Sequence, residues 1–284
     1  MIQLWTPEIT TLLTRFFKAN HLPYGQDFPG HIPTGRFSNG KLNPDFVASF
    51  LGIKQTVPTS LDPNLSNDAF NGLVFASAGS GYDELTTILT GAIPVPKQLG
   101  QFKSYIAKLS RIFGNNEAQN IIEKSLAIIS AGTNDFGFNY YLLPMRIQQF
   151  DINGFQDFLL KALHDFVKEL YKRGCRKIVI AGLPPMGCVP ILVRKDSSRP
   201  SIEHVWRTRM LMPVLQWKAR FTETEEGCCG SGLLEASFLC NPETPVCETP
   251  SDFMFWDKLS SKRAAYKAMS HLLVNQILPK LTLE

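Results

Sequence analysis

The stretch LAIISAGTND (residues 126–135) decides how this chain of 284 residues folds. It joins an apolar run of strand length to a turn made of glycine and polar residues. The same pattern occurs in GLVFASAGSG (72–81) and in KIVIAGLPPMGCVP (177–190). Continuous apolar strands that alternate with helical sequence are typical of a parallel sheet with helices on both faces. We therefore predict an α/β fold.

Helical periodicity fills the sequence between these strands. Residues 155–173 place large apolar side chains at spacings of three and four, with Gly174 at the end where a helix stops. Further helices are expected at 44–50, as two helices within 97–125 that are broken at Gly114, and at about 262–278. The last helix is expected to bury one apolar face: Ala265, Met269, Leu272, Leu273 and Ile277.

Composition narrows the possible functions. The chain is 44% hydrophobic and 19% charged, as globular proteins are, and its net charge is +4. Its basic residues are scattered and form no basic run with interleaved aromatic residues, which argues against a nucleic-acid partner. No apolar run approaches the roughly 18 residues of a membrane span. No zinc-like spacing of Cys and His is present either, so we expect no metal and no cofactor.

The cysteines favour an oxidising compartment. There are six, and four of them lie close together at 228, 229, 240 and 247 in a Gly- and Pro-rich segment. Disulfides that staple this loop are one interpretation, and free buried thiols are the alternative; the pairing cannot be read from the sequence. Asn64 begins a glycosylation sequon. Residues 1–20 do not resemble a signal peptide, so retention inside the cell stays open.

Two groups at the ends of the predicted strands suit acyl transfer. Ligands of parallel sheets bind beyond the carboxyl ends of the strands. There, Gly79 can expose a backbone N–H and Asn134 offers a side-chain amide, which together would form an oxyanion hole. The alternative is structural: Gly79 would only permit a tight turn, and residues 133–135 would only cap a helix.

Several further blocks carry a family resemblance. These blocks, in chain order, are LPYGQDFPG, IPTGRFSNGKLNPDF, FASAGSGYDE, ISAGTNDF, CRKIVIAGLPPMGC, EGCCGSGLLE with LCNP, and FWDKLSSKRAAY. Together they resemble the plant branch of the GDSL esterase/lipase family, within the SGNH hydrolases, from about Phe17 to the C-terminus. The resemblance implies a single three-layer α/β domain over residues 1–284, a small-molecule ester or lipid substrate, hydrolysis of carboxylic esters, and an extracellular location.

The resemblance also assigns site residues. It matches Gly79 and Asn134 to the oxyanion donors of the family. It matches Asp257 to the acid of the DxxH block, which orients a general-base histidine three residues later. That position is Ser260 here. The FGDS block with the nucleophilic serine has no counterpart in this chain, and residues 1–15 contain no serine.

Two segments depart from the family pattern. Residues 1–16 diverge from it, and residues 191–226 are shorter than the family's usual connection. We therefore expect one or two strands of the sheet to be missing. Because both the nucleophile and the base are absent, we also predict impaired hydrolysis. The alternative is a non-catalytic relative or an acyl-binding remnant.

Overall fold

The computed structural model describes most of the chain. The described residues are 2–5, 18–62, 70–143, 145–184, 186, 189–192, 220–232 and 235–281. The chain forms two compact units. The first comprises Met1–Glu8, Pro44–Gly182 and Leu272–Glu284, and the second comprises Ile9–Asn43 and Leu183–His271.

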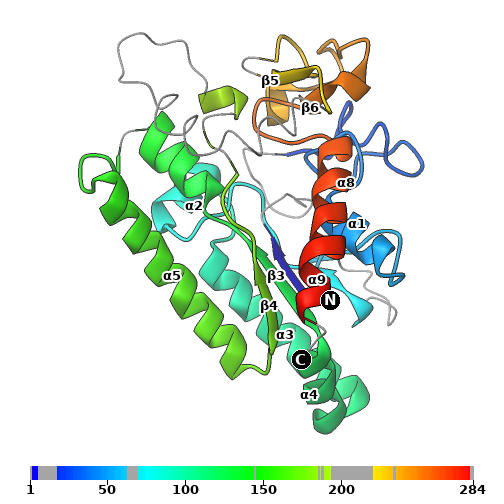
Figure 1. Cartoon of the computed structure of the whole chain (residues 1–284), viewed down its shortest axis with the longest axis vertical. Helices are drawn as coiled ribbons and strands as arrows, with labels where there is room; N and C mark the ends of the chain where they lie inside the picture. Colours follow the sequence, from blue (N-terminus) through cyan, green and yellow to red (C-terminus); the bar gives the residue numbers. More distant parts are fainter. Residues whose placement is uncertain are drawn as a thin grey trace. The chain divides into compact units, whose positions relative to one another are not determined.

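A four-stranded parallel sheet forms the centre of the first unit. Its strands are β1 (Ile2–Trp5), β2 (Leu73–Val74), β3 (Leu126–Ser130) and β4 (Lys177–Ile180). They lie in the order β2-β1-β3-β4, and every pairing is parallel (Figure 1). The predicted α/β architecture is confirmed. The first predicted strand is shorter than expected, since within 72–81 only the two residues of β2 pair.

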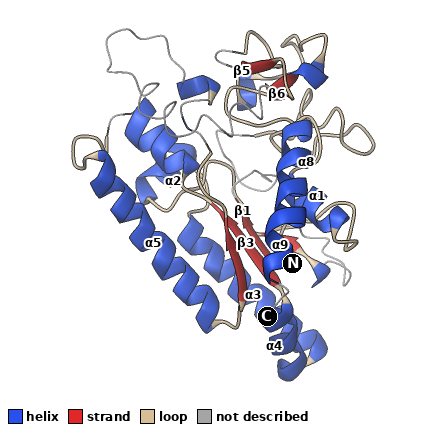
Figure 2. Cartoon of the chain, in the orientation of Figure 1, coloured by secondary structure: helices blue, strands red, loops and turns tan. Residues whose placement is uncertain are grey.

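Helices lie on both sides of this sheet (Figure 2). They are α1 (Asn43–Phe50), α2 (Glu84–Thr90), α3 (Val95–Phe113), α4 (Asn115–Lys124), the π-helix η2 (Asp135–Leu142), α5 (Ile152–Lys172), the π-turn η7 (Leu273–Ile277) and α9 (Leu278–Leu281). Val47 of α1 and Leu278 of α9 pack against Ile128 of β3. Phe102 of α3 packs edge-on against Phe75, with ring centroids 5.7 Å apart.

The long helix α5 shows why its sequence signal was strong. Asp151 caps its N-terminus by accepting a hydrogen bond from the Gly154 N–H at 2.7 Å. Its apolar stripe buries Phe155, Leu159, Phe166 and Leu170. Gly174 follows the helix with φ +102°, a conformation that glycine adopts at little cost.

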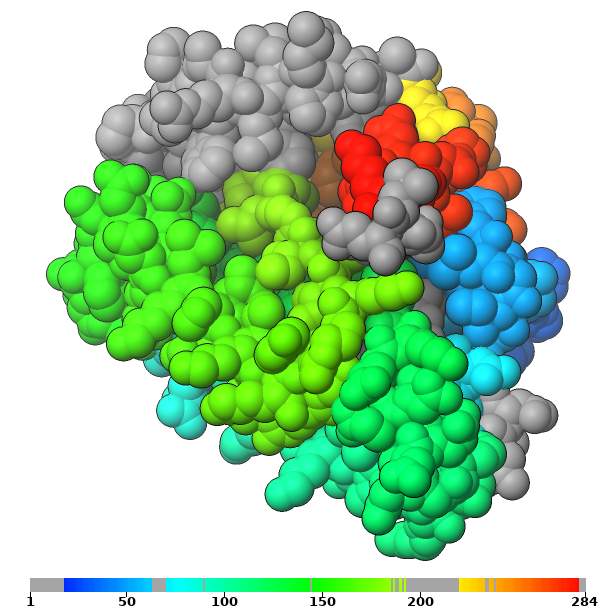
Figure 3. All heavy atoms as spheres, turned by 60° about the horizontal axis from the view of Figure 1, so that its bottom comes forward, coloured from blue at the N-terminus to red at the C-terminus, as the bar shows by residue number. Residues whose placement is uncertain are grey.

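In Figure 3, the chain from α4 to β4 (sea green to yellow-green) forms much of the surface that faces the viewer.

The expected loss of strands is not confirmed. Ile2–Trp5, inside the divergent segment 1–16, forms β1 between β2 and β3. No Gly-containing turn follows these four residues, as one follows β3 and β4, so no sequence pattern indicated this strand. Residues 193–219, within the shortened segment 191–226, lie outside the described part of the chain.

Disulfides and short elements build the second unit. β5 (Glu223–Gly227) and β6 (Phe253–Phe255) form a parallel pair (Figure 1), and the helices are η4 (Pro190–Leu192), η5 (Ser237–Leu239), η6 (Pro250–Asp252) and most of α8 (Arg263–Leu272). Cys228 pairs with Cys247, and Cys229 pairs with Cys240. The disulfide interpretation is confirmed for these four residues. Cys175, in the first unit, is a buried free thiol.

The buried face predicted for the last helix is partly wrong. Ala265 is buried, but Leu272 and Ile277 are 43% and 45% exposed. The helix changes to a π-turn at Leu273–Ile277. A π-turn holds more residues per turn than an α-helix, so the apolar stripe expected from α-helical spacing is out of phase by Ile277. Leu272 ends α8 and is exposed before this turn begins. Among the described residues, no helix is both long enough and apolar enough to cross a membrane.

Candidate functional site

Gly79 lies in the loop that follows β2, in the first unit. Its φ of +73° is in the left-handed region, and a Cβ at this position would lie 2.6 Å from the Thr90 Cβ. Thr90 donates a hydrogen bond from Oγ1 to the Gly79 carbonyl at 2.8 Å, which fixes the turn. The Gly79 N–H has no hydrogen-bond partner among the described residues. The turn therefore requires glycine and leaves a backbone donor unused.

Asn134 follows β3 and reaches the same loop. Its side-chain amide donates to the Ser80 carbonyl at 2.8 Å, one residue beyond Gly79. A primary amide has two N–H groups, so a second donor remains. Asn134 stands at the N-terminus of η2 but makes no side-chain capping bond there. The capping interpretation is therefore wrong for this side chain, and the structure brings the two predicted donors to adjacent loops.

Asp135, the next residue, links these two loops through hydrogen bonds of its side chain. Its carboxylate is fully buried and accepts from the backbone N–H groups of Tyr82 and Asp83 at 3.0 and 2.9 Å. The Thr86 hydroxyl donates to it at 2.6 Å. A Cβ at position 81 would overlap the same carboxylate, so the loop can run past Asp135 only with glycine at this position. Asp135 thus joins the loop after β2 to the end of β3.

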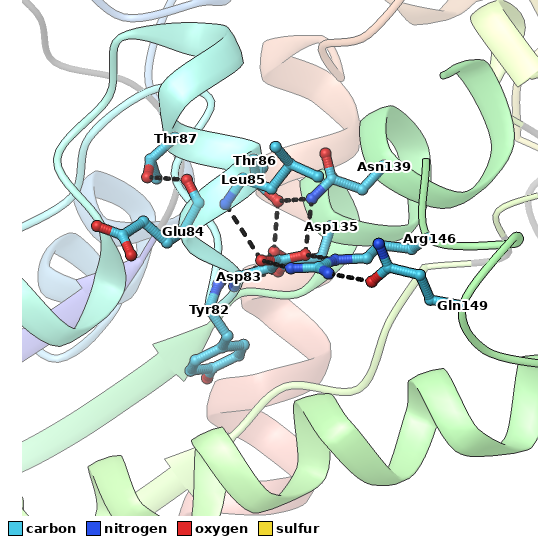
Figure 4. A network of polar contacts seen from close by, with 10 residues as sticks. All are labelled: Tyr82, Asp83, Glu84, Leu85, Thr86, Thr87, Asp135, Asn139, Arg146 and Gln149. Carbon is cyan, nitrogen blue, oxygen red and sulfur yellow. Dashed lines mark hydrogen bonds and ion pairs between the residues drawn. The ribbon is translucent and has the colours of Figure 1, made fainter. Parts of the chain in front are cut away.

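Asp83 is a second buried carboxylate with a different set of partners. Arg146 binds it through Nε and Nη2, both at 2.8 Å, and the Asn139 amide donates to it at 3.0 Å (Figure 4). It also caps α2 by accepting from the Leu85 N–H. Burial acts to raise the pKa of Asp83, but the hydrogen bonds from Arg146 and Leu85 outweigh it, and the pKa lies below its ordinary value.

The pKa of Asp135 moves in the opposite direction. Burial raises the pKa of Asp135 to about 7, although the hydrogen bonds from Thr86 and from the backbone of Asp83 and Tyr82 favour the ionised form. The negative charge of Asp83 adds to the increase. Two neighbouring carboxylates therefore differ in protonation near neutral pH, a pattern that is enriched at functional sites.

Asp257, the predicted triad acid, lies in the second unit, two residues after the end of β6. Its carboxylate is buried, with Oδ1 accepting from the backbone N–H groups of Leu259 and Ser260 at 2.8 and 2.6 Å. Oδ2 accepts from the Tyr24 hydroxyl at 2.6 Å, and this hydroxyl in turn accepts from the Ser237 N–H. Burial raises the pKa of Asp257, against the effect of these hydrogen bonds.

Ser260 fills the position where the family pattern has histidine. Its side chain is only 3% exposed. Its hydroxyl is near enough to Asp257 to help lower the pKa of that carboxyl, yet it makes no hydrogen bond of good geometry within the described residues. A hydroxyl has neither the second ring nitrogen nor the basicity of imidazole. Ser260 therefore presents no imidazole to the carboxylate of Asp257.

Sequence reasoning predicted Gly79, Asn134 and Asp257 as site residues but did not predict the residues that hold them in place. Gly79 and Asn134 meet within the first unit, while Asp257 and Ser260 lie in the second. Asn64 lies outside the described residues. The supports are Asp135 and Tyr24, and both stand inside recognised blocks, GTND and LPYG. Motif membership was the only signal for them.

Comparisons with known proteins identify the family of this chain. Residues 24–273 match the GDSL-like lipase/acylhydrolase family. Three GDSL esterase/lipases of Arabidopsis thaliana are 41%, 44% and 43% identical to the chain, each across 92% of it and 83% of the relative. The first match spans 299 aligned positions, more than the 284 residues of this chain, so the relative carries residues inside the match that this chain lacks. The chain belongs to the GDSL esterase/lipase family.

Proposed function

We propose that this chain keeps the acyl-binding part of a carboxylic-ester hydrolase and is impaired in hydrolysis. The observation that carries the proposal is Ser260, three residues after the buried acid Asp257, where the family's DxxH block has its base. The names of the relatives, esterase and lipase, support carboxylic esters, including lipids, as the substrate class.

The impairment follows from the chemistry of the base. A serine nucleophile attacks an ester only after a neighbouring group accepts its proton, and a serine hydroxyl at position 260 does not accept a proton near neutral pH. Loss of the nucleophile or the base of a serine hydrolase costs about 10⁶ in turnover. The family's FGDS block is also not found in residues 1–284.

The retained part is the donor pair. The unused N–H of Gly79 and the second N–H of the Asn134 amide are suited to an ester carbonyl or a carboxylate oxygen. Such donors bind an acyl group even where the attack on it is lost. The non-catalytic alternative, an acyl-binding protein, therefore shares this site with the hydrolase.

We also propose one family domain and an extracellular location. The family match over 24–273 runs through both compact units, which supports a single GDSL esterase/lipase domain. The disulfides Cys228–Cys247 and Cys229–Cys240 support an oxidising compartment. Glycosylation at Asn64 belongs to the same proposal.

The test combines a probe with a substrate. The purified 284-residue chain is incubated with a fluorophosphonate probe, which labels activated serines, and separately with p-nitrophenyl butyrate. We expect labelling and turnover no higher than in a heat-treated sample. The variant Asp257→Asn serves as the matched control, because an intact triad would lose activity with it. Turnover well above the heat-treated sample that falls in Asp257→Asn would overturn the proposed impairment.

A further inference from the structure

Two buried carboxylates of the first unit, Asp83 and Asp135, play different parts. Asp83 is 2% exposed and carries a cation, Arg146, on both of its oxygens. Within the described part of the chain no cation pairs with Asp135; its carboxylate is held by two backbone N–H groups and one hydroxyl. In Figure 4, Asp83 lies between Arg146 and the side chains of Thr86 and Asn139. Asp83 thus anchors the network by charge, and Asp135 holds a loop by hydrogen bonds.

Asp135 adjoins Asn134 along the chain and binds the loop that carries Gly79. Along the chain it follows Asn134 directly, and it opens the π-helix η2. Across space it grips Tyr82 and Asp83, three and four residues after Gly79, while Gly81 passes against its carboxylate. The hydrogen bond from the Asn134 amide to the Ser80 carbonyl links the same two loops. A shift of this carboxylate relative to the loop would therefore change the gap between the two donors.

We propose that Asp135 is a positioning residue for the Gly79–Asn134 donor pair, and that gain or loss of its proton changes how this pair binds a carboxylate or carbonyl oxygen. The ligand class rests on the proposed function. The ionised carboxylate accepts three hydrogen bonds and tightens the loop, whereas a proton on one oxygen removes acceptor capacity there.

Other titratable and charged groups lie near Asp135. Asp83 faces Asp135 from the loop and stays ionised beside Arg146, whose side chain also reaches Gln149. Tyr82 lies on the same loop, and burial together with Asp135 raises the pKa of its phenol. Neither Asp83 nor Tyr82 changes charge near pH 7, so Asp135 is the group of this network that titrates there.

Linkage gives the proposal a second consequence. A bound carboxylate adds negative charge near the loop and makes ionisation of Asp135 less favourable. By reciprocity, ionisation of Asp135 weakens binding of the carboxylate. Butyrate is ionised throughout pH 5.5–8, so we expect its affinity to fall about fivefold or more across this range, as is typical of coupled sites. If Asp135 did not titrate in this range, its charge would add nothing to the pH dependence of the affinity.

The experiment follows the two donors directly. The full chain is labelled with ¹⁵N at glycine and asparagine, and the Gly79 amide and Asn134 side-chain signals are recorded from pH 5.5 to 8. We expect both to titrate together with a midpoint near 7. In Asp135→Asn the titration should disappear. In Asp45→Asn, which removes another buried carboxylate of the first unit that accepts from the Val57 N–H, it should persist.

A milder variant keeps the test decisive if Asp135→Asn does not fold. Thr86→Val removes one hydrogen bond that favours ionised Asp135, so the midpoint of the Gly79 signal should move upward. Absence of any titration in the wild-type chain, its persistence in Asp135→Asn, or an unchanged midpoint in Thr86→Val would overturn the proposal.

Butyrate is then added at each pH. Shifts of the Gly79 and Asn134 signals that weaken as the pH rises, and become independent of pH in Asp135→Asn, support the proposal. Failure of butyrate to move either signal counts against the proposed acyl-binding function alone, since the ligand-free titration judges the positioning role.

Discussion

Replacing Asp135 by Asn should change how the stability of the chain depends on pH. Asparagine is close in shape to a protonated aspartate but cannot ionise. The pKa of Asp135 is raised from 3.8 to about 7 in the folded chain because the carboxyl is buried. Its contribution to stability is therefore fully present below about pH 3.8 and is lost as the pH rises through about 7.

The size of the effect follows from the difference between the two pKa values. At about 1.36 kcal/mol for each unit, ionisation of Asp135 removes about 4 kcal/mol of stability between acid and mildly alkaline pH. That is a large part of the 5–15 kcal/mol by which typical domains are stable. Against this, Asn places an NH₂ group opposite the Tyr82 N–H, which costs about 1–3 kcal/mol at every pH.

The assay compares the two proteins by urea unfolding, followed by tryptophan fluorescence, in steps from pH 4 to pH 8. All other titrating groups cancel in the difference between wild type and variant. The free energy of unfolding of Asp135→Asn, relative to wild type, should rise by about 3–4 kcal/mol across this range. Parallel curves for the two proteins would refute the reasoning, because Asp135 would then be ionised throughout.

Three further outcomes are expected. Tyr24→Phe leaves the Ser237 N–H and one oxygen of Asp257 buried without their partner, so urea unfolding should show a loss of about 1–3 kcal/mol. Gly79→Ala should destabilise the chain clearly more than Gly52→Ala, because both have positive φ but only Gly79 would meet a side chain; equal thermal midpoints would contradict this. Ser260→His in the 284-residue chain should not restore turnover of p-nitrophenyl butyrate, since the FGDS nucleophile is not in it; measurable turnover would show another nucleophile.

Strong periodicity made the main elements predictable. α5 and β3 appear where the sequence placed them, because long apolar stripes and strand-length apolar runs are favourable in few other conformations. The meeting of Gly79 with Asn134 followed from one rule, that the carboxyl ends of parallel strands share an edge. The exposure of Ile277 was not predictable, since no local signal marks the π-turn that rotates this side chain.

The residues that hold the candidate site residues in place were not predicted, because their contacts join distant parts of the sequence. The bond between Tyr24 and Asp257 joins residues 233 apart, which no local pattern encodes. Asp135 was visible as a letter of GTND, but its role depends on where its carboxylate points and on how deeply it is buried. Both properties are set by packing against the loop after β2, and packing is decided by the whole unit.

The two disulfides have a consequence for how this protein must be prepared. Cys228 and Cys229 donate backbone hydrogen bonds to the carbonyls of Phe255 and Trp256, the two residues that precede Asp257. A chain made in a reducing cytosol would lack the covalent links that hold this support. Missing probe labelling in such a sample would then report the state of its thiols and not its catalytic chemistry. The choice of a secretory or periplasmic expression host is therefore part of any activity measurement on this chain.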